Sequence, residues 1–227
     1  MRHVAKLIKN RLVAALMRTG RLAPLALWCY HWLYPSPVCA LAPERLYLYL
    51  DTLLKKRALD GEIVEIGSFL CGASIMATKM LCNIGASKPY TCIDTFNGFV
   101  AQQISDDIQK GTPADLENTF PASFELVTKI LSRHGVSGVQ LIQGDICANV
   151  VLPGRIAVAL LDCNLEEPIR VGLEKLYPRL VSGGCILVDD CAPAQGWRAR
   201  FGYQRFCADH GISERYLYGM GIIEKML

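Results

Sequence analysis

The stretch EIVEIGSFLCGASIMATKMLCNIG, residues 62–85, shows how the chain is built. Residues 62–67 form an apolar run that ends in glycine, as a buried strand does, and residues 72–85 have the length and the closing glycine of a helix. The same alternation of strand and helix recurs along the rest of the chain. Near-continuous apolar strands that alternate with helices are typical of a parallel sheet covered on both faces. We therefore predict an α/β fold with a doubly wound, mostly parallel sheet.

The other expected elements follow from Pro43 onward. Helices are predicted at residues 43–61, 121–135, 167–180 and 196–211. Further strands are predicted at residues 89–94, 139–145, 156–162 and 184–190, and residues 215–226 are expected to close the sheet as a hairpin, which gives seven strands. Residues 95–119 are polar and irregular, and they are long for a connection in a compact domain. We expect this segment to be a mobile lid.

The first 43 residues differ in charge from the rest of the chain. They hold six lysines and arginines and no acid, so the remainder is acidic although the whole chain has a net charge of +3. That total is too small to indicate nucleic-acid binding. We expect residues 1–42 to be an N-terminal helical extension and residues 43–227 to be the main domain. The basic, aromatic residues 1–34 are expected to serve self-association as a homo-oligomer first and peripheral contact with an anionic membrane second.

The cysteine pattern bears on the compartment. None of the ten cysteines forms a CxxC pair, which argues against a zinc ribbon or a thioredoxin site. The apolar stretch of residues 22–34 is interrupted by Pro24 and His31 and is too short to span a bilayer, so it is not expected to be a leader peptide. We expect a reducing, cytoplasmic location, with membrane association as the second choice.

Polar residues follow the predicted strands at their carboxyl ends, where open α/β sheets bind ligands. Glu65, before the first glycine turn, suits a cationic group such as the ammonium of an amino acid, and the free N–H groups after the turn suit a carboxylate. Asp94 stands where a ribose-binding acid belongs, and Asp145 could accept the exocyclic amine of a purine. Amino acid, ribose and adenine together describe S-adenosylmethionine. The expected cofactor site comprises Glu65, Gly67, Ser68, Gly72, Ser74, Asp94 and Asp145.

The stretch CILVDD, residues 185–190, ends in two adjacent carboxylates, Asp189 and Asp190. Like charges side by side at the end of an apolar strand are costly unless a cation lies between them. Asp162 independently follows another predicted strand, so three acids are expected at one edge of the sheet. The alternative is that Asp189 and Asp190 cap the following turn and bind nothing.

Four segments together resemble the macrocin O-methyltransferase family, class I methyltransferases that methylate sugar hydroxyls in antibiotic pathways. The segments are GEIVEIGSFLCGASI (61–75), IDTFNGF (93–99), LIQGD (141–145) and LYPRLVSGGCILVDD (176–190). The resemblance runs from about Pro43 to the end of the chain. It implies a Rossmann-like class I methyltransferase fold with a seven-stranded sheet. It also implies that S-adenosylmethionine is the methyl donor and that Asp162, Asp189 and Asp190 hold Mg²⁺.

The resemblance implies a reaction as well. A magnesium ion takes carboxylate oxygens and keeps several waters, which substrate oxygens can replace. Such an ion would orient a hydroxyl and lower its pKa, and methyl transfer then requires positioning in line with the sulfonium. We expect O-methylation of a sugar or of a glycosylated small molecule. The alternatives are a catechol-type O-methyltransferase acting on a phenol, a catalytically silent S-adenosylmethionine-binding module, and a membrane-surface scaffold.

One departure from the family pattern concerns the general base. The family commonly has Asp-Gly-Asp-Leu-Tyr-Glu after the fourth strand, with the second Asp as the favoured base, and this chain has DCNLEE at residues 162–167. Asn164 cannot accept a proton from a hydroxyl. We assign Asp162, Asn164 and Glu167 to the catalytic site. Either water, Glu166 or Glu167 takes the proton, or the reaction has been lost.

Overall fold

The structure is a computed structural model that describes residues 35–193 and 196–226. The chain divides into two units, Met1–Pro37 and Val38–Leu227, and the fold described below is that of the second. The predictions made for residues 1–34 lie outside the described residues. Among those described, no helix is long and apolar enough to cross a membrane.

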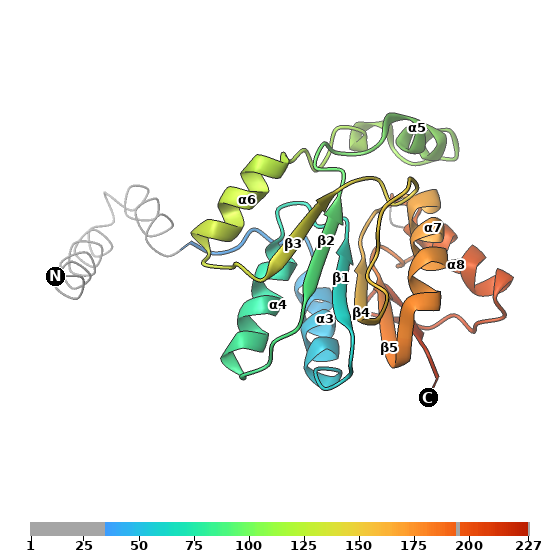
Figure 1. Ribbon diagram of the computed structural model, residues 1–227. Coiled ribbons are helices and arrows are strands. Elements are labelled where there is room, and N and C mark those ends of the chain that lie inside the picture. Colours follow the sequence, from blue (N-terminus) through green and yellow to red (C-terminus); the bar gives the residue numbers. More distant parts are fainter. Residues whose placement is uncertain (1–34, 194–195, 227) are drawn as a thin grey trace, which may run out of the picture. The chain divides into compact units, whose positions relative to one another are not determined.

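A seven-stranded sheet runs through the second unit in the order β3-β2-β1-β4-β5-β7-β6 (Figure 1). Its strands are β1 (Glu62–Ile66), β2 (Tyr90–Asp94), β3 (Val139–Gln143), β4 (Ile156–Leu161), β5 (Leu180–Val188), β6 (Tyr216–Leu217) and β7 (Met220–Glu224). The first five pair in parallel, and β7 is antiparallel to both β5 and β6. The predicted fold class is confirmed, because the sheet is seven-stranded and mostly parallel.

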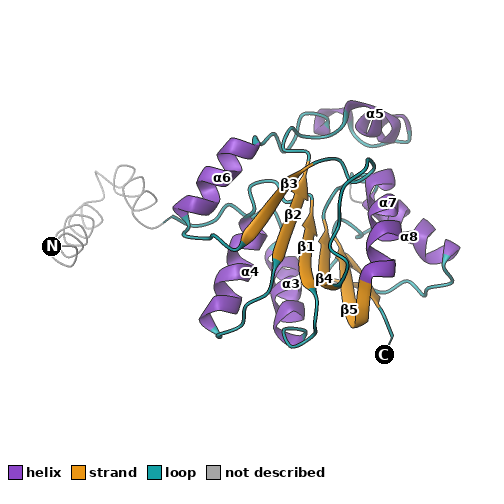
Figure 2. Ribbon diagram, viewed as in Figure 1, coloured by secondary structure: helices purple, strands orange, loops and turns teal. Residues whose placement is uncertain are grey.

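Helices cover both faces of this sheet (Figure 2). The helices α3 (Pro43–Lys55), α4 (Gly72–Asn83) and α6 (Phe124–Arg133) pack on one face, in a core that also takes in Ile63 and Tyr90. The helices α7 (Glu166–Leu176) and α8 (Ala199–Asp209) pack on the other face, in a core that includes Val64 and Ile66. All six residues of β4 are buried, as expected for a strand with helices on both sides.

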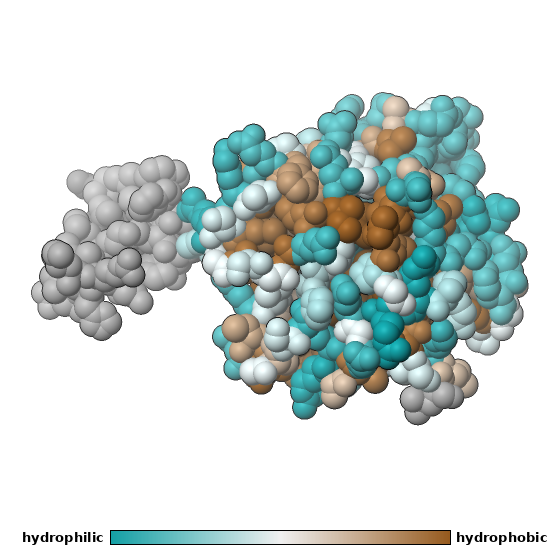
Figure 3. Space-filling view, in the orientation of Figure 1, coloured by the Kyte–Doolittle hydropathy of each residue, from teal (hydrophilic) through white to brown (hydrophobic). Residues whose placement is uncertain are grey.

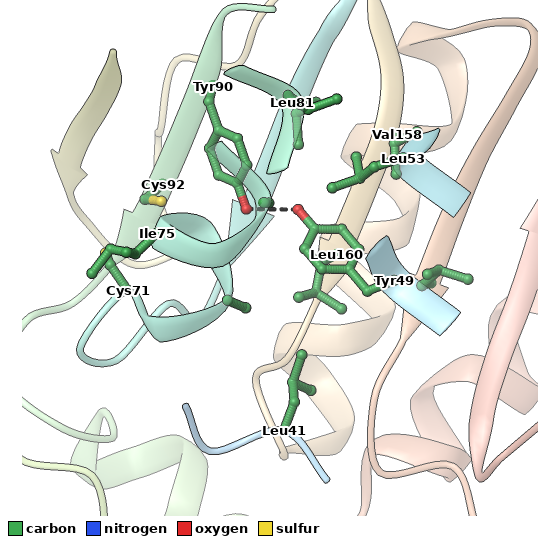
Figure 4. Close-up of a cluster of buried hydrophobic side chains, with 14 of the residues drawn as sticks. Leu41, Tyr49, Leu53, Cys71, Ile75, Leu81, Tyr90, Cys92, Val158 and Leu160 are labelled. Atoms are coloured by element: carbon green, nitrogen blue, oxygen red, sulfur yellow. Dashed lines mark hydrogen bonds between the residues drawn. The ribbon is translucent and has the colours of Figure 1, made fainter. Parts of the chain in front are cut away.

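Side chains of each strand alternate between these two cores. In β1, Ile63 and Glu65 therefore point toward α3 and α4, which is the side drawn in Figure 4. On that side the hydroxyls of Tyr49, from α3, and Tyr90, from β2, lie 2.6 Å apart in the middle of the apolar cluster (Figure 4). A polar network thus runs through the core directly behind the first strand.

Residues 95–119 differ from the prediction. They contain the helix α5 (Ala101–Gln109) and a short 3₁₀ turn (Ala114–Leu116), where an irregular segment was expected. Its apolar residues, Ala101, Ile104 and Ile108, do lie at helical spacing. The helix was missed because it is short and these three residues stand among polar residues, glycines and a proline. Its buried residues are Ile104 and the acid Asp107. The helix lies beyond the carboxyl ends of the strands, where a lid would lie (Figure 1).

The closing hairpin is confirmed. Tyr218 and Gly219 connect β6 to β7, and both have a positive φ, 53° and 79°. Two consecutive residues in this region form the type I′ turn that matches the twist of a two-residue hairpin, and glycine adopts it without strain. The hairpin sets β7 beside β5 and so completes the sheet next to the acidic carboxyl end of β5.

Candidate active site

The carboxyl ends of the parallel strands surround one pocket of about 310 Å³. Its wall includes seven of the predicted site residues: Gly67, Asp94, Asp145, Asp162, Asn164, Asp189 and Asp190. Five other predicted residues do not line it: Glu65, Ser68, Gly72, Ser74 and Glu167. On the face shown in Figure 3, hydrophobic residues gather in a band below the hydrophilic α5.

The two glycines of the first turn each lie in close contact with another backbone segment of the chain. Gly67 has a φ of +81°, and a Cβ added there would lie 1.9 Å from the carbonyl oxygen of Asp162. A Cβ added to Gly72 would lie 2.0 Å from the carbonyl oxygen of Val38. Gly67 also lines the pocket, so its place at the cofactor stays a prediction, whereas Gly72 lies against Val38 and does not line the pocket. Gly67 brings the end of β1 against the end of β4, and Gly72 makes room for the segment that precedes α3.

Glu65 lies behind the pocket wall. Its carboxylate accepts hydrogen bonds from the hydroxyls of Ser74, at 2.7 Å, and of Tyr90. Burial raises the pKa of Glu65 to about 7, although these two hydrogen bonds oppose the shift. Glu65 and Ser74, both expected at the cofactor, instead form a buried network in the core, because odd-numbered residues of β1 face α3 and α4.

Asp94 ties together two loops at the pocket. Its Oδ2 accepts a hydrogen bond from the backbone N–H of Phe69, at 2.9 Å, and its Oδ1 accepts one from that of Phe96, at 2.8 Å. Phe69 and Phe96 both have a positive φ, 47° and 46°, so Asp94 holds two strained loop residues in place. Burial raises its pKa. Oδ1 also accepts a hydrogen bond of 3.4 Å from the hydroxyl of Thr95, so Oδ2 is the oxygen better able to accept one from a ligand hydroxyl.

The neighbouring Ser68 is buried, and its hydroxyl has no hydrogen-bond partner among the described residues. Such a group is costly to bury unless a ligand or water supplies the partner. Ser68 therefore lies next to the pocket wall with an unmet polar atom, although it is absent from the lining itself.

Asp145 connects the pocket to α5. Its Oδ2 accepts a hydrogen bond of 2.8 Å from the amide of Gln103, and its Oδ1 accepts one of 2.9 Å from the backbone N–H of Cys147. Farther along α5, Asp107 accepts a hydrogen bond of 2.9 Å from the backbone N–H of Glu166, the first residue of α7. The helix is thus fastened at two points over the pocket.

The three acids of β4 and β5 come together as predicted. Asp162, Asp189 and Asp190 each offer a carboxylate oxygen within 4.8 Å of the others. Burial and the two neighbouring acids raise the pKa of Asp162 well above its usual value, and the pKa of Asp189 is raised to about 6, chiefly by burial. The Asp162 carboxylate accepts no hydrogen bond from any described residue. The oxygens of the Asp162 carboxylate are therefore available to bind a cation or a hydrogen-bond donor of a ligand.

A cation from the protein lies between the paired acids. The Nη1 atom of Arg45 is 2.8 Å from Asp189 Oδ1 and 2.7 Å from Asp190 Oδ1. Arg45 belongs to the first turn of α3, and its side chain is only 12% exposed. The sequence analysis missed this residue. In the sequence, Arg45 is a basic residue next to an acid, Glu44, in the first turn of a predicted helix. Such a pair is typical of a solvated helix surface, so it gave no indication of a site residue.

Asn164, which stands in the position of the family's general base, holds the side chain of Asp190 in place. Asn164 donates a hydrogen bond of 2.6 Å from Nδ2 to Asp190 Oδ2. Both residues have a positive φ, 62° for Asn164 and 54° for Asp190, in the region that asparagine and aspartate tolerate best among residues with side chains. Asp190 therefore accepts from Arg45 on one oxygen and from Asn164 on the other.

The two glutamates that follow Asn164 are engaged elsewhere. Glu166 forms ion pairs with Arg198, at 2.8 Å, and with Lys110, at 3.3 Å. Glu167 accepts two hydrogen bonds from Arg170, and its side chain is 49% exposed. Neither lines the pocket, so the expectation that Glu166 or Glu167 takes the substrate proton is corrected.

Four aromatic rings form one wall of the pocket, and none was predicted. Phe120 contacts Phe69, with ring centroids 5.3 Å apart, and lies 6.1 Å from both Phe99 and Trp197. Phe99 and Trp197 are 5.4 Å apart. The rings come from four separate loops, and each remains partly exposed. Throughout this article the four are called the aromatic wall.

Comparisons with known proteins agree with this arrangement. The model of a family described as macrocin-O-methyltransferase (TylF) matches residues 46–217. Among solved structures, the O-methyltransferase NovP superposes with a TM-score of 0.65 at 17% identity, over 81% of this chain and 79% of NovP. The calicheamicin methyltransferase CalS11 also gives a TM-score of 0.65 at 17% identity, over 97% of this chain and 92% of CalS11. At these identities the two structures establish the fold alone. A search of curated protein sequences gives no significant match.

Proposed function

Because the chain belongs to the macrocin-O-methyltransferase family and is an O-methyltransferase, we propose that it uses S-adenosylmethionine to methylate a hydroxyl of a sugar or a glycosylated small molecule. The observation that carries this proposal is the convergence of Asp94, Asp145 and Asp162 on one pocket, at the carboxyl ends of three different strands. This is the edge at which α/β sheets bind their ligands.

Different residues of the pocket wall suit different parts of S-adenosylmethionine. Asp94 can accept hydrogen bonds from ribose hydroxyls, and Asp145 can accept one from the adenine amine. The buried, unpartnered hydroxyl of Ser68 could reach the amino-acid end after a small movement of the turn. S-adenosylmethionine supplies an electrophilic methyl group on a sulfonium. The chain has to hold that methyl group in line with the acceptor oxygen and exclude water, a task to which α5 and the aromatic wall are suited.

The acid cluster fits a hard divalent cation such as Mg²⁺. Its oxygens lie within 4.8 Å of one another, slightly more than the ~4.2 Å between opposite ligands at Mg²⁺–oxygen distances, so small side-chain movements suffice. No described residue donates a hydrogen bond to Asp162 that would compete with the cation. Bound Mg²⁺ would lower the pKa of the acceptor hydroxyl. Water then takes the proton, since Asn164 cannot, and Glu166 and Glu167 do not line the pocket.

The aromatic wall favours a second candidate function, methylation of a phenol or catechol. A flat aromatic acceptor could stack against these rings with its own ring centroid 4.5–7 Å from theirs. Phe120 and Trp197 present such a surface beside the acid cluster. CalS11 is described as a TDP-rhamnose 3'-O-methyltransferase, and this description agrees with the sugar proposal without deciding between the two.

The test begins with mass spectrometry of the purified protein for bound S-adenosylmethionine or its demethylated product. A panel of glycosides and catechols is then offered with S-adenosylmethionine, with Mg²⁺ and with a chelator. Methylation of a glycoside that the chelator abolishes supports the proposal. Methylation of catechols alone would assign the second function, and cofactor binding without methylation of any acceptor would favour a silent binding module.

Residues 1–34 are proposed to mediate self-association, with an anionic membrane as the second target. The charge pattern and the aromatic residues of this segment support the proposal. Deletion of residues 1–34 should lower the mass measured by sedimentation if they join subunits. Flotation with liposomes that depends on anionic lipid would assign the membrane role instead.

A further inference from the structure

We propose that Arg45 is a built-in counter-cation of the Asp189–Asp190 pair, that it competes with a divalent metal ion for these carboxylates, and that it thereby sets the metal affinity of the site. This inference rests on the metal site of the proposed function and adds a residue to it. It identifies the cation that the acid pair requires in the absence of metal.

The position of Arg45 is fixed by its surroundings. The side chain is 12% exposed, and a single nitrogen, Nη1, binds both acids at 2.7–2.8 Å. On the other side lies the hairpin turn: a Cβ added to Gly219 would be 3.3 Å from Arg45 Nη2 and 3.1 Å from the Cβ of Ala192. A side chain at position 219 would therefore crowd the guanidinium, which packs closely against this turn. An arginine held in this way is part of the pocket, whose wall includes it.

Arg45 and Asn164 between them donate to three of the four carboxylate oxygens of the acid pair. Asp190 accepts from Arg45 on Oδ1 and from Asn164 on Oδ2, and Asp189 accepts from Arg45 on Oδ1. Asp162 accepts no hydrogen bond from the part of the chain that the structure describes. A metal ion bound between Asp189 and Asp190 would approach their oxygens to about 2.1 Å and would lie close to the guanidinium charge. An ion that takes Asp189 Oδ1 or Asp190 Oδ1 competes with a hydrogen bond of Arg45, and an ion on the other oxygens still meets the positive charge of the guanidinium.

The charges lead to the same conclusion. Three ionised carboxylates and one guanidinium leave the cluster with two negative charges, and a neutral residue in place of Arg45 would leave three. Attraction for a divalent cation grows with that charge. At a pH where the acids are ionised, Arg45 should therefore weaken metal binding. Without metal, Arg45 supplies the cation of the Asp189–Asp190 pair, so the empty cluster is less destabilised than three acids with no cation beside them would be.

The experiment measures Mg²⁺ binding by calorimetry at pH 8 for the full chain and its variants. Arg45→Met removes the charge and the donors, and Arg45→Gln removes the charge but keeps a donor. Arg57→Met is the control, because Arg57 is exposed and donates only to the carbonyl of Leu54 among the contacts described. Arg45→Met and Arg45→Gln should each bind Mg²⁺ about tenfold tighter or more, and the control should match the wild type.

A second readout is thermal stability with and without Mg²⁺. At the same excess of Mg²⁺, the stabilisation should be larger for Arg45→Gln than for the wild type, because the stabilisation by a ligand grows with the logarithm of its concentration divided by its Kd. Equal or weaker Mg²⁺ affinity in a folded Arg45→Gln protein would overturn the role of Arg45 and leave the metal site intact. If neither the wild type nor any variant binds Mg²⁺, the metal site itself is refuted, and binding of S-adenosylhomocysteine still tests the methyltransferase assignment separately.

Discussion

The side-chain amide of Asn164 donates a hydrogen bond of 2.6 Å to Oδ2 of Asp190. An aspartate at position 164, as in the family pattern, would set two carboxylates against each other at this distance unless a metal ion or a proton separated them. The asparagine thus replaces a repulsive contact by an attractive one. It also removes the side chain that would take the substrate proton.

Asn164→Asp should restore a general base and should raise the rate of methyl transfer by about 10²-fold in the presence of Mg²⁺, the lower end of the contribution of a positioned base. The same change removes the amide donor, so the metal-free protein should lose about 1–3 kcal/mol of stability. Turnover of both proteins on an accepted acceptor, with and without chelator, is the measurement. If the wild type methylates nothing while Asn164→Asp does, the chain is a silent binding module in its natural form.

Asp145→Ala and Asp94→Ala should each weaken S-adenosylmethionine binding by about 1–3 kcal/mol, the range for a lost partner of a buried polar group. Asp94→Ala should also destabilise the protein, because the N–H groups of Phe69 and Phe96 lose their acceptor. Calorimetry with the cofactor measures the first effect. Asp115→Ala is the control, since Asp115 is an exposed acid away from the pocket wall. Unchanged affinity in both pocket variants would remove the cofactor assignment.

The sheet could be predicted from sequence because its signal is local. Each strand is an apolar run closed by glycine or an acid, and parallel strands end at the same edge, so Asp94, Asp145 and Asp162 were expected together before their contacts were known. The helix α5 could not be predicted in this way. It is short, it offers only Ala101, Ile104 and Ile108 as an apolar face, and it is also held by polar contacts such as that between Gln103 and Asp145, which cannot be read from sequence.

Two features of the site depend on contacts between distant parts of the chain. Arg45 meets Asp189 across 144 residues of sequence, and no local pattern indicates such a pair. Glu65 was placed at the cofactor because it precedes the glycine turn, yet both faces of β1 are buried, and only the packing of α3 and α4 shows which core receives its carboxylate. Arg45 was missed because its partner is distant in sequence. Glu65 was misplaced because either face of β1 could have received its side chain.

Glu65 gives a prediction for pH. Its pKa is about 7 in the folded protein, above its ordinary value of 4.5, so the folded state holds a proton that the unfolded state has lost between these values. Stability should therefore fall as the pH rises from about 4.5 to about 7 and stay level above, by a total on the order of 3 kcal/mol.

The Glu65→Gln variant should lack the part of the pH dependence of stability that comes from Glu65. Its free energy of unfolding relative to that of the wild type should increase from pH 5 to pH 8, as measured by urea denaturation at each pH. Glu125→Gln is the control, because Glu125 is 78% exposed on α6. Parallel pH profiles for the wild type and Glu65→Gln would show that Glu65 titrates normally.

The last prediction concerns residues 95–119 as a lid over the pocket. The helix α5 is fastened by Gln103 to Asp145 and by Asp107 to the backbone of Glu166 at the start of α7. Asp107 is buried, and Lys110 and Arg198 lie 3.8 and 4.0 Å from its carboxylate, so it is the stronger attachment. If the segment opens to admit ligands, limited proteolysis should cut it first in the ligand-free protein, and S-adenosylhomocysteine should slow the cut.

Asp107→Ala should speed this cleavage and reduce the protection by S-adenosylhomocysteine, because the N–H of Glu166 and two basic side chains lose their shared acceptor. The adjacent Asp106→Ala is a matched control: Asp106 is exposed and accepts a hydrogen bond only from Gln102, one turn earlier in the same helix, among the contacts described. Its cleavage should match that of the wild type. Equal protection of the segment with and without ligand would mean that α5 is a fixed part of the pocket wall, and the acceptor would then have to enter past the aromatic wall.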